Sequence, residues 1–210
     1  DRYRIAAAAD PVKQRTEAVR DFAPEEERDS IRLFKDATSL LEEPRLADVA
    51  IIGTQDDYHY APCKKAMELG YHVLLEKPIA KTLRETLELR DLARQLKRRV
   101  AVCHVLRYTT FYNKLKELIS SGRIGDVVSI CANENVGYWH QAHSFVRGNW
   151  RNSQETSPMI LQKSCHDMDI LTWLLGKKCK AVSSFGSTRL FKPECAPEGA
   201  ALRCLDGCKA

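Results

Sequence analysis

The chain has 210 residues, of which 44% are hydrophobic and 29% charged, a composition that excludes a disordered protein. Its net charge of +5 is spread along amphipathic stretches with one basic cluster at residues 97–99, which argues against nucleic-acid binding. No apolar run approaches the ~18 residues that a membrane span requires, and no charged leader with an apolar core opens the sequence. We therefore expect a cytoplasmic protein without a membrane partner, whose cysteines are reduced.

The first half of the sequence alternates short apolar runs with helical patterns, which is typical of a parallel sheet with crossover helices. The continuous apolar run at residues 48–54 fits a strand buried on both faces. Thr82 and Glu85 form the capping-box signature at the start of a long helix. Strands are predicted over residues 4–10, 48–54, 72–75 and 100–106, and helices over 11–22, 59–70 and 82–98.

The pattern changes near residue 108. Alternation over residues 126–136 is typical of a strand in an antiparallel sheet, and an irregular aromatic region at 137–152 follows. Helices are predicted over residues 111–121 and 158–175, and a further strand over 180–191. The sequence therefore predicts two domains, at residues 1–107 and 108–210.

A glycine-rich turn is missing from the predicted parallel sheet. A doubly wound nucleotide-binding domain normally opens with a strand and a Gly-x-Gly-x-x-Gly turn, whose amides meet a pyrophosphate. The nearest glycine pair, Gly122 and Gly125, precedes a strand and does not open a helix. Because the sequence starts where the second strand of such a domain would lie, we expect an N-terminally truncated, incomplete sheet.

Polar residues follow three of the predicted strands, at the edge where open parallel sheets bind ligands. Asp10 ends the first strand, where a carboxylate would accept hydrogen bonds from ribose hydroxyls and repel a 2′-phosphate, favouring NAD over NADP. An ordinary strand-end turn is the alternative interpretation of Asp10. The loops after the next two strands add Thr54, Gln55, His59, Glu76, Lys77 and Pro78 as candidate cofactor-binding residues.

Several motifs together resemble the Gfo/Idh/MocA oxidoreductase family. They are IAAAADP, HYAPCKKAMELGYHVLLEKPIA, HVLRYTTFYNKLKELISSGRIGDVVSI, NWR and CHDMD. The resemblance covers nearly the whole chain. It implies a nucleotide-binding Rossmann domain followed by an α/β domain with an open, mostly antiparallel sheet. It also implies NAD(P)-linked redox chemistry on a sugar, a cyclitol or a related polyol.

Lys77 is the leading catalytic candidate. A lysine at the carboxyl end of a strand, fixed by the following proline and partly desolvated, has its neutral form favoured by burial. It can then share a proton with the substrate hydroxyl that loses hydride. A solvated turn lysine is the alternative, and Glu76 is interpreted as orienting the loop or binding the nicotinamide ribose.

Three polar residues line one stripe of the otherwise apolar helix at 158–175. Gln162, His166 and Asp169 stand at i, i+4 and i+7. His166 is the second catalytic candidate, with Asp169 expected to hold one of its ring nitrogens; a core histidine with satisfied hydrogen bonds is the alternative.

This sequence departs from the family pattern at Gln162, a position at which typical members carry an aspartate. A glutamine amide can bind a hydroxyl but cannot accept a proton in the working pH range. Either His166 acts with Asp169 behind it, or Lys163 or Lys77 serves as the base, or the protein binds without turnover.

The resemblance implies further substrate-binding candidates, because Arg107 and Tyr108 match the family position near the active-site mouth. Trp150 with Arg151 could close over a polyol by stacking and bidentate hydrogen bonding. A donor-rich loop also suits sugar recognition, and contains Tyr138, Trp139, His140 and His143.

No metal is predicted, although two weak alternatives exist. The spacing of His140 and His143 could suit zinc, but no carboxylate or cysteine follows at a helpful spacing. Cys195, Cys204 and Cys208 could be three ligands of a structural metal, with free thiols as the default interpretation.

These patterns predict an NAD-dependent oxidoreductase, with NADP also possible, that acts on a sugar or polyol as a dimer or tetramer. Two alternatives stay open. Tightly held NAD could support glycoside cleavage, or the protein could be a non-catalytic sensor that binds a nucleotide.

Overall fold

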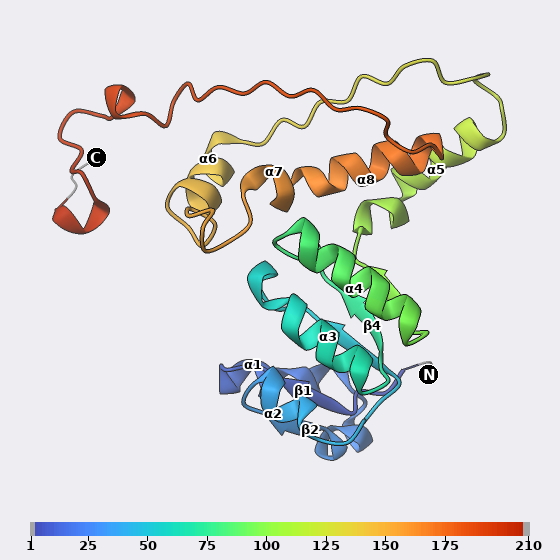
Figure 1. Cartoon of the computed structure of the whole chain (residues 1–210). Helices are drawn as coiled ribbons and strands as arrows, with labels where there is room; N and C mark the ends of the chain where they lie inside the picture. Colours follow the sequence, from blue (N-terminus) through green and yellow to red (C-terminus); the bar gives the residue numbers. More distant parts are fainter. Residues whose placement is uncertain (1–2, 208–210) are drawn as a thin grey trace.

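The computed structural model describes residues 3–207, apart from the side chain of Cys204, and its five short strands form two parallel sheets (Figure 1). In the first sheet, β1 (Ala7–Ala9) pairs with β2 (Arg32–Phe34). The second has the order β3 (Val49–Ile52), β4 (His72–Leu75) and β5 (Val100–Val102). Rossmann-like parallel pairing is thus confirmed, but the strands are divided between two sheets.

Two strand boundaries differ from the sequence prediction. β2 was not predicted, because it is three residues long and its apolar residues are flanked by charges, so only pairing with β1 defines it. The strand predicted at residues 100–106 ends at Val102, because the amide of His104 donates back to the carbonyl of Val102 at 2.8 Å. His104 therefore lies beyond the strand end.

Helices α3 (Tyr60–Glu68) and α4 (Leu83–Gln95) cover one face of the second sheet (Figure 1). Their buried residues and those of the strands form one hydrophobic core. It comprises Leu41, Ile52, Cys63, Ala66, Met67, Tyr71, Val73, Leu75 and Leu89. The predicted capping box of α4 is confirmed, since Thr82 and Glu85 bond each other's backbone amides. This core fixes the strand ends that carry the candidate site.

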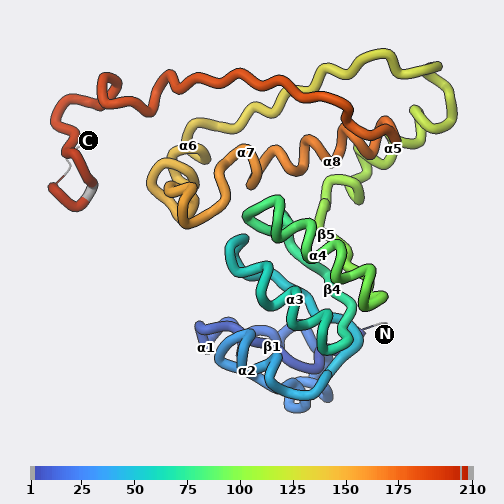
Figure 2. Tube along the Cα trace, viewed as in Figure 1, coloured from blue at the N-terminus to red at the C-terminus, as the bar shows by residue number. Residues whose placement is uncertain are grey.

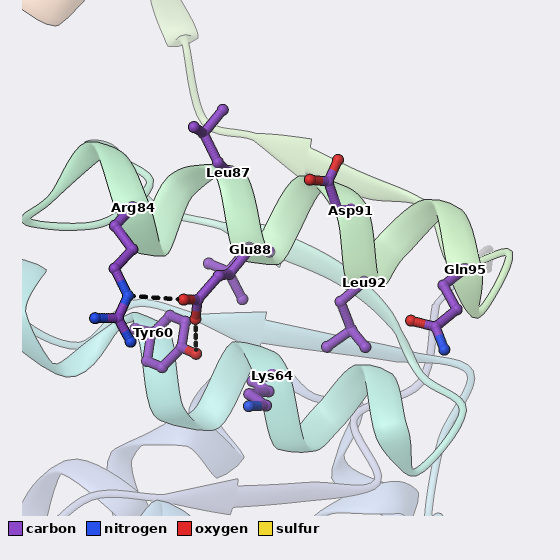
Figure 3. Close-up of a pocket in the computed structure, with 9 residues that line it drawn as sticks. Tyr60, Lys64, Arg84, Leu87, Glu88, Asp91, Leu92 and Gln95 are labelled. Atoms are coloured by element: carbon purple, nitrogen blue, oxygen red, sulfur yellow. Dashed lines mark hydrogen bonds and ion pairs between the residues drawn. The ribbon is translucent and has the colours of Figure 1, made fainter.

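A groove between α3 and α4 lies on the outer surface of this layer (Figure 3). Glu88 accepts hydrogen bonds from the hydroxyl of Tyr60 at 2.5 Å and from Nε of Arg84 at 2.9 Å. None of the residues lining this groove is a predicted site residue. The network ties the two helices together away from the strand ends.

The remaining helices of the first half are short. They are α1 (Lys13–Ala18), η1 (Val19–Phe22), η2 (Glu25–Ser30), α2 (Ala37–Leu41), η3 (Asp56–Tyr58) and η4 (Val105–Tyr108). The helix predicted over residues 11–22 is thus an α-helical turn that continues as a 3-10 turn.

Helices dominate the second half of the chain (Figure 2). They are α5 (Thr110–Ser120), α6 (Tyr138–Gln141), the π-helical turn η5 (Ala142–Val146), α7 (Met159–Gln162) and α8 (Ser164–Leu175), with short turns at η6 (Pro193–Cys195) and η7 (Cys204–Asp206). The single helix predicted over 158–175 is broken at Lys163, and α8 packs against α5.

The open, mostly antiparallel sheet expected in the second half is not confirmed. Residues 126–136 and 180–191, both predicted as strands, contain no strand, since neither has a hydrogen-bonded partner strand within residues 3–207. Side chains along them are exposed, with Val128 at 96% and Phe185 at 96%. An alternating pattern predicts a strand only where a neighbouring strand completes its backbone hydrogen bonds.

Within the described residues, no helix has the length and apolar character needed to cross a membrane. The six cysteines with described side chains are free thiols.

Candidate active site

The Glu76-Lys77-Pro78 segment leaves β4 at the carboxyl edge of the second sheet, with a cis peptide before Pro78. Buried His59 holds this segment against the loop after β3. Its Nδ1 lies 2.8 Å from the carbonyl oxygen of Pro78, and its Nε2 lies 3.0 Å from that of Thr54. The structure therefore gives His59 a place between two backbone loops, each ring nitrogen facing a carbonyl.

Lys77 reaches from the end of β4 to the end of α7. Its Nζ donates to the side-chain oxygen of Gln162 at 2.6 Å and to the carbonyl oxygen of the same residue at 3.0 Å. Burial lowers the pKa of Lys77, and the nearby charge of Lys163 adds to the shift. Gln162, where this chain departs from the family pattern, therefore contacts the leading catalytic candidate Lys77 directly.

His166 lies one helical turn beyond Gln162 and is half-buried. Burial lowers its pKa, and the charge of Lys77 and the neighbouring His104 lower it further. Its Nδ1 is buried and has no hydrogen-bond partner among the described residues. These contacts favour a neutral imidazole.

Asp169 does not hold His166, contrary to the expected pairing. Instead, Arg107 donates to it in a bidentate ion pair, through Nε at 2.7 Å and through Nη2 at 2.5 Å. The hydrogen bonds to Asp169 raise the pKa of Arg107. Because a guanidinium matches both carboxylate oxygens, it takes the positions that a single imidazole nitrogen would use.

His104 enters the site although it was not among the predicted residues. Its Nε2 lies 3.8 Å from Oδ1 of Asp169, and its ring meets that of His166 edge to face at 6.0 Å. The sequence pattern placed His104 inside a strand. A strand predicted to end at Val102 would have placed His104 among the polar residues that follow strand ends.

Asp56 is a second functional candidate that the sequence did not single out. It is 2% exposed, and its two oxygens accept hydrogen bonds from Nε1 of Trp150 at 3.1 Å and from the amide of Ser157 at 2.9 Å. Burial raises the pKa of Asp56, but the hydrogen bonds from Ser157 and Trp150 outweigh it, so the pKa lies below its ordinary value. Trp150 is thereby held at the loop after β3.

Three other predicted residues make local contacts or are exposed. Arg151 is exposed and donates to the carbonyl of Gly148 at 3.1 Å. His140 stacks on Trp139 at 5.4 Å, and His143 is exposed. No group of three potential metal ligands occurs among the side chains that the structure describes. The cysteine-site alternative involves Cys208 and the side chain of Cys204, which lie outside the described residues.

Two family profiles match the chain. Residues 1–104 match "Oxidoreductase family, NAD-binding Rossmann fold", and residues 116–203 match "Oxidoreductase family, C-terminal alpha/beta domain", both under the name Gfo/Idh/MocA. The chain belongs to the Gfo/Idh/MocA oxidoreductase family. The predicted resemblance is thus confirmed, together with the NAD-binding character of the first half.

The chain spans between about a third and a half of the length of the relatives that it matches. A putative oxidoreductase YteT of Bacillus subtilis is 30% identical, over 70% of this chain and 34% of the relative. An inositol 2-dehydrogenase of Streptomyces avermitilis is 30% identical, over 86% of this chain and 48% of the relative. Among solved structures, the crystal structure of a scyllo-inositol dehydrogenase from Lactobacillus casei with bound NAD(H) and scyllo-inositol matches with a TM-score of 0.64 at 22% identity. The match covers 83% of this chain and 49% of the dehydrogenase chain. That structure supports the shared fold.

The residues of this Gfo/Idh/MocA chain fit two parts of NAD. Oδ1 of Asp10 accepts from the amide of Val12 at 2.8 Å, while Oδ2 accepts no hydrogen bond within residues 3–207 and lies 3.7 Å from Nη1 of Arg15, so acceptor capacity remains for ribose hydroxyls. Glu76 accepts from the amide of Lys77 at 3.2 Å, directly after β4. Thr54 and Gln55 are exposed in the loop after β3. These carboxylate acceptors suit the ribose hydroxyls of a dinucleotide, and the charge of Asp10 would repel a 2′-phosphate.

Proposed function

We propose that this chain is part of an NAD-dependent dehydrogenase that oxidises a secondary alcohol of a sugar, a cyclitol or a related polyol. The observation that carries the proposal is the contact of Lys77, at the end of β4, with Gln162, one turn before His166. The loop after β4 thereby meets the polar stripe of α7 and α8. The inositol 2-dehydrogenase relative supports a polyol substrate, and Asp10 favours NAD over NADP.

In this proposal, each side chain of the site has its own role in alcohol oxidation. When bound, NAD supplies the nicotinamide that accepts the hydride. Lys77 accepts the hydroxyl proton as its neutral amine, which burial favours, and neutral His166 holds or shares that proton. The amide of Gln162 binds a substrate hydroxyl and keeps Nζ of Lys77 in place. Lys163, at the break between α7 and α8, adds positive charge that disfavours a protonated Lys77.

Arg107 pairs with Asp169, the third residue of the same helix stripe. Their bidentate pair leaves the outer donors of the guanidinium for a polyol hydroxyl. Trp150, anchored by Asp56, and exposed Arg151 lie in the segment that would close over the substrate. In this proposal, Pro78 and His59 hold the shape of the loop that carries Lys77.

The proposal is tested by turnover of the full-length protein with NAD across a panel of inositols and aldoses, measured as NADH formation. We expect NADH with at least one cyclitol or sugar. Tight NAD binding without NADH from any polyol would contradict the proposal and favour a sensor, for which Gln162 is the supporting residue. Hydrolysis of chromogenic glycosides without net NADH would point to glycoside cleavage.

Replacing Gln162 by aspartate is expected to raise the pKa of Lys77, because a carboxylate beside an ammonium stabilises the charged form. The rise in kcat/KM with pH should then move to higher pH, since the neutral amine forms later. The pKa is measured by NMR of the lysine side chain, assigned with Lys77→Met. Gln95→Glu, on the outer face of α4, is the matched control and should leave both measurements unchanged. A pH profile identical to that of the wild type in Gln162→Asp would exclude Lys77 as the base.

The domain division and assembly are also part of the proposal. We place the boundary between the dinucleotide and substrate domains near residue 107, and we propose a cytoplasmic dimer or tetramer. Val128, Val182 and Phe185 are exposed apolar residues that a partner subunit could cover. Analytical ultracentrifugation of the full-length protein measures the assembly, and a monomer at micromolar concentration would contradict it.

A further inference from the structure

His104 occupies a fixed position just beyond β5. Its amide donates to the carbonyl of Val102 at 2.8 Å, which turns the chain out of the strand and into η4. The side chain is 19% exposed, so the ring lies inside the site. The sheet therefore determines where this imidazole stands.

The ring of His104 lies between Asp169 and His166. Its Nε2 is 3.8 Å from Oδ1 of Asp169, whose carboxylate is immobilised by two hydrogen bonds from Arg107. The same ring meets that of His166, with centroids 6.0 Å apart and planes at 81°. Edge-to-face geometry is one of the two arrangements that aromatic pairs prefer.

No hydrogen bond orients the ring of His166 through Nδ1. That nitrogen is buried and lacks a partner among residues 3–207, whereas catalytic histidines are ordinarily oriented by a hydrogen bond to the nitrogen that does not face the substrate. The edge-to-face contact with His104 is the aromatic contact that His166 makes within this part of the chain. Packing thus replaces the orienting hydrogen bond.

Electrostatics permit the two rings to pack closely. His104 faces Asp169, Arg107 and Lys77, and burial is the largest effect lowering its pKa. His166 faces Lys77, His104, Asp167 and Lys163, and burial again lowers its pKa most. Two neutral imidazoles can meet edge to face, whereas two imidazolium ions would repel each other.

We infer that His104 is a positioning residue that fixes the ring plane of His166 by edge-to-face packing, with Asp169 and Arg107 as its support. The consequence for turnover rests on the proposed function, because it assumes that His166 handles the substrate hydroxyl proton. The packing itself does not depend on that assumption. Asp169 therefore acts on His166 through His104 and not by direct contact.

The test compares His104→Ala, which removes the ring, with His104→Phe, which keeps an aromatic edge at the same place. In the full-length protein with NAD and its polyol, His104→Ala is expected to lower kcat by ~10- to 100-fold, with KM changed less than about threefold, because misplaced catalytic groups cost rate more than binding. His104→Phe should recover kcat to within about threefold of the wild type. His72→Asn keeps an acceptor for the amide of Arg99 and is the matched histidine control.

A second readout needs no turnover. In protein labelled with ¹³C-histidine, with His166→Gln for assignment, the ring signals of His166 should shift and broaden in His104→Ala and stay near their wild-type positions in His104→Phe. Unchanged signals in folded His104→Ala would overturn the inference. Equal impairment of folded Phe and Ala variants would also overturn it, since a ring nitrogen and not packing would then matter. Failure of the wild type to oxidise any polyol would contradict the proposed function but leave the NMR comparison intact.

Discussion

Lys77→Ala is expected to lower kcat/KM for polyol oxidation about a thousandfold, since a positioned base contributes ~10²- to 10⁴-fold. The side chain is held by two hydrogen bonds to Gln162, so it meets a hydroxyl bound at α7 without reorganisation. NAD affinity, measured by calorimetry, should fall far less than kcat/KM, because the proposed ribose acceptors Asp10 and Glu76 remain. Lys64→Ala, on the outer face of α3, is the control and should retain full activity.

The pH dependence of kcat/KM is a second test of Lys77 as the base. Burial places the pKa of Lys77 below its ordinary value of 10.5, so the neutral amine forms at a lower pH than that of an exposed lysine. The wild-type kcat/KM should therefore rise with pH through this depressed pKa, and Lys77→Ala should lose that rise. Activity of Lys77→Ala within tenfold of the wild type would transfer the base role to His166 or Lys163.

Local patterns predicted the elements whose stability is local. The capping box of Thr82 and Glu85 depends on residues three apart, and the four predicted strands of the first half all exist. The strand prediction for residues 126–136 was wrong. An alternating pattern indicates which side chains would share a face of a strand, but it does not indicate whether a partner strand supplies the backbone hydrogen bonds. β2 was missed for the converse reason, since its partner β1 defines it.

The sequence predicted which residues belong to the candidate site, but it did not predict which of them contact each other. Strand-end position identified Lys77, and helical spacing identified Gln162 and His166, yet their meeting joins positions 85 residues apart. Asp169 was assigned to His166 because the two share a helix stripe. Arg107, 62 residues away, displaces that pairing with a bidentate geometry that spacing cannot express.

Asp56→Ala is expected to lower the free energy of unfolding by about 3 kcal/mol, because it removes two charge-assisted hydrogen bonds and leaves buried donors without a partner. The affected donors, Nε1 of Trp150 and the amide of Ser157, lie 94 and 101 residues along the chain from Asp56. Urea unfolding followed by tryptophan fluorescence measures the loss. Asp57→Ala is the control: Asp57 is exposed, and its replacement should change stability by less than ~0.5 kcal/mol.

The contribution of Asp56 should depend on pH in a defined direction. Its pKa in the folded protein is depressed below the ordinary value of 3.8, so the unfolded chain binds the proton more readily. The stabilisation is then fully present above that ordinary value and is lost as the pH falls through the lower, folded pKa. The wild type and Asp56→Ala should differ most at neutral pH and converge in acid, whereas Asp57→Ala should follow the wild-type curve throughout. A constant difference between wild type and Asp56→Ala down to the most acidic pH would show that packing, and not the carboxylate charge, holds Trp150 and Ser157 at the loop after β3.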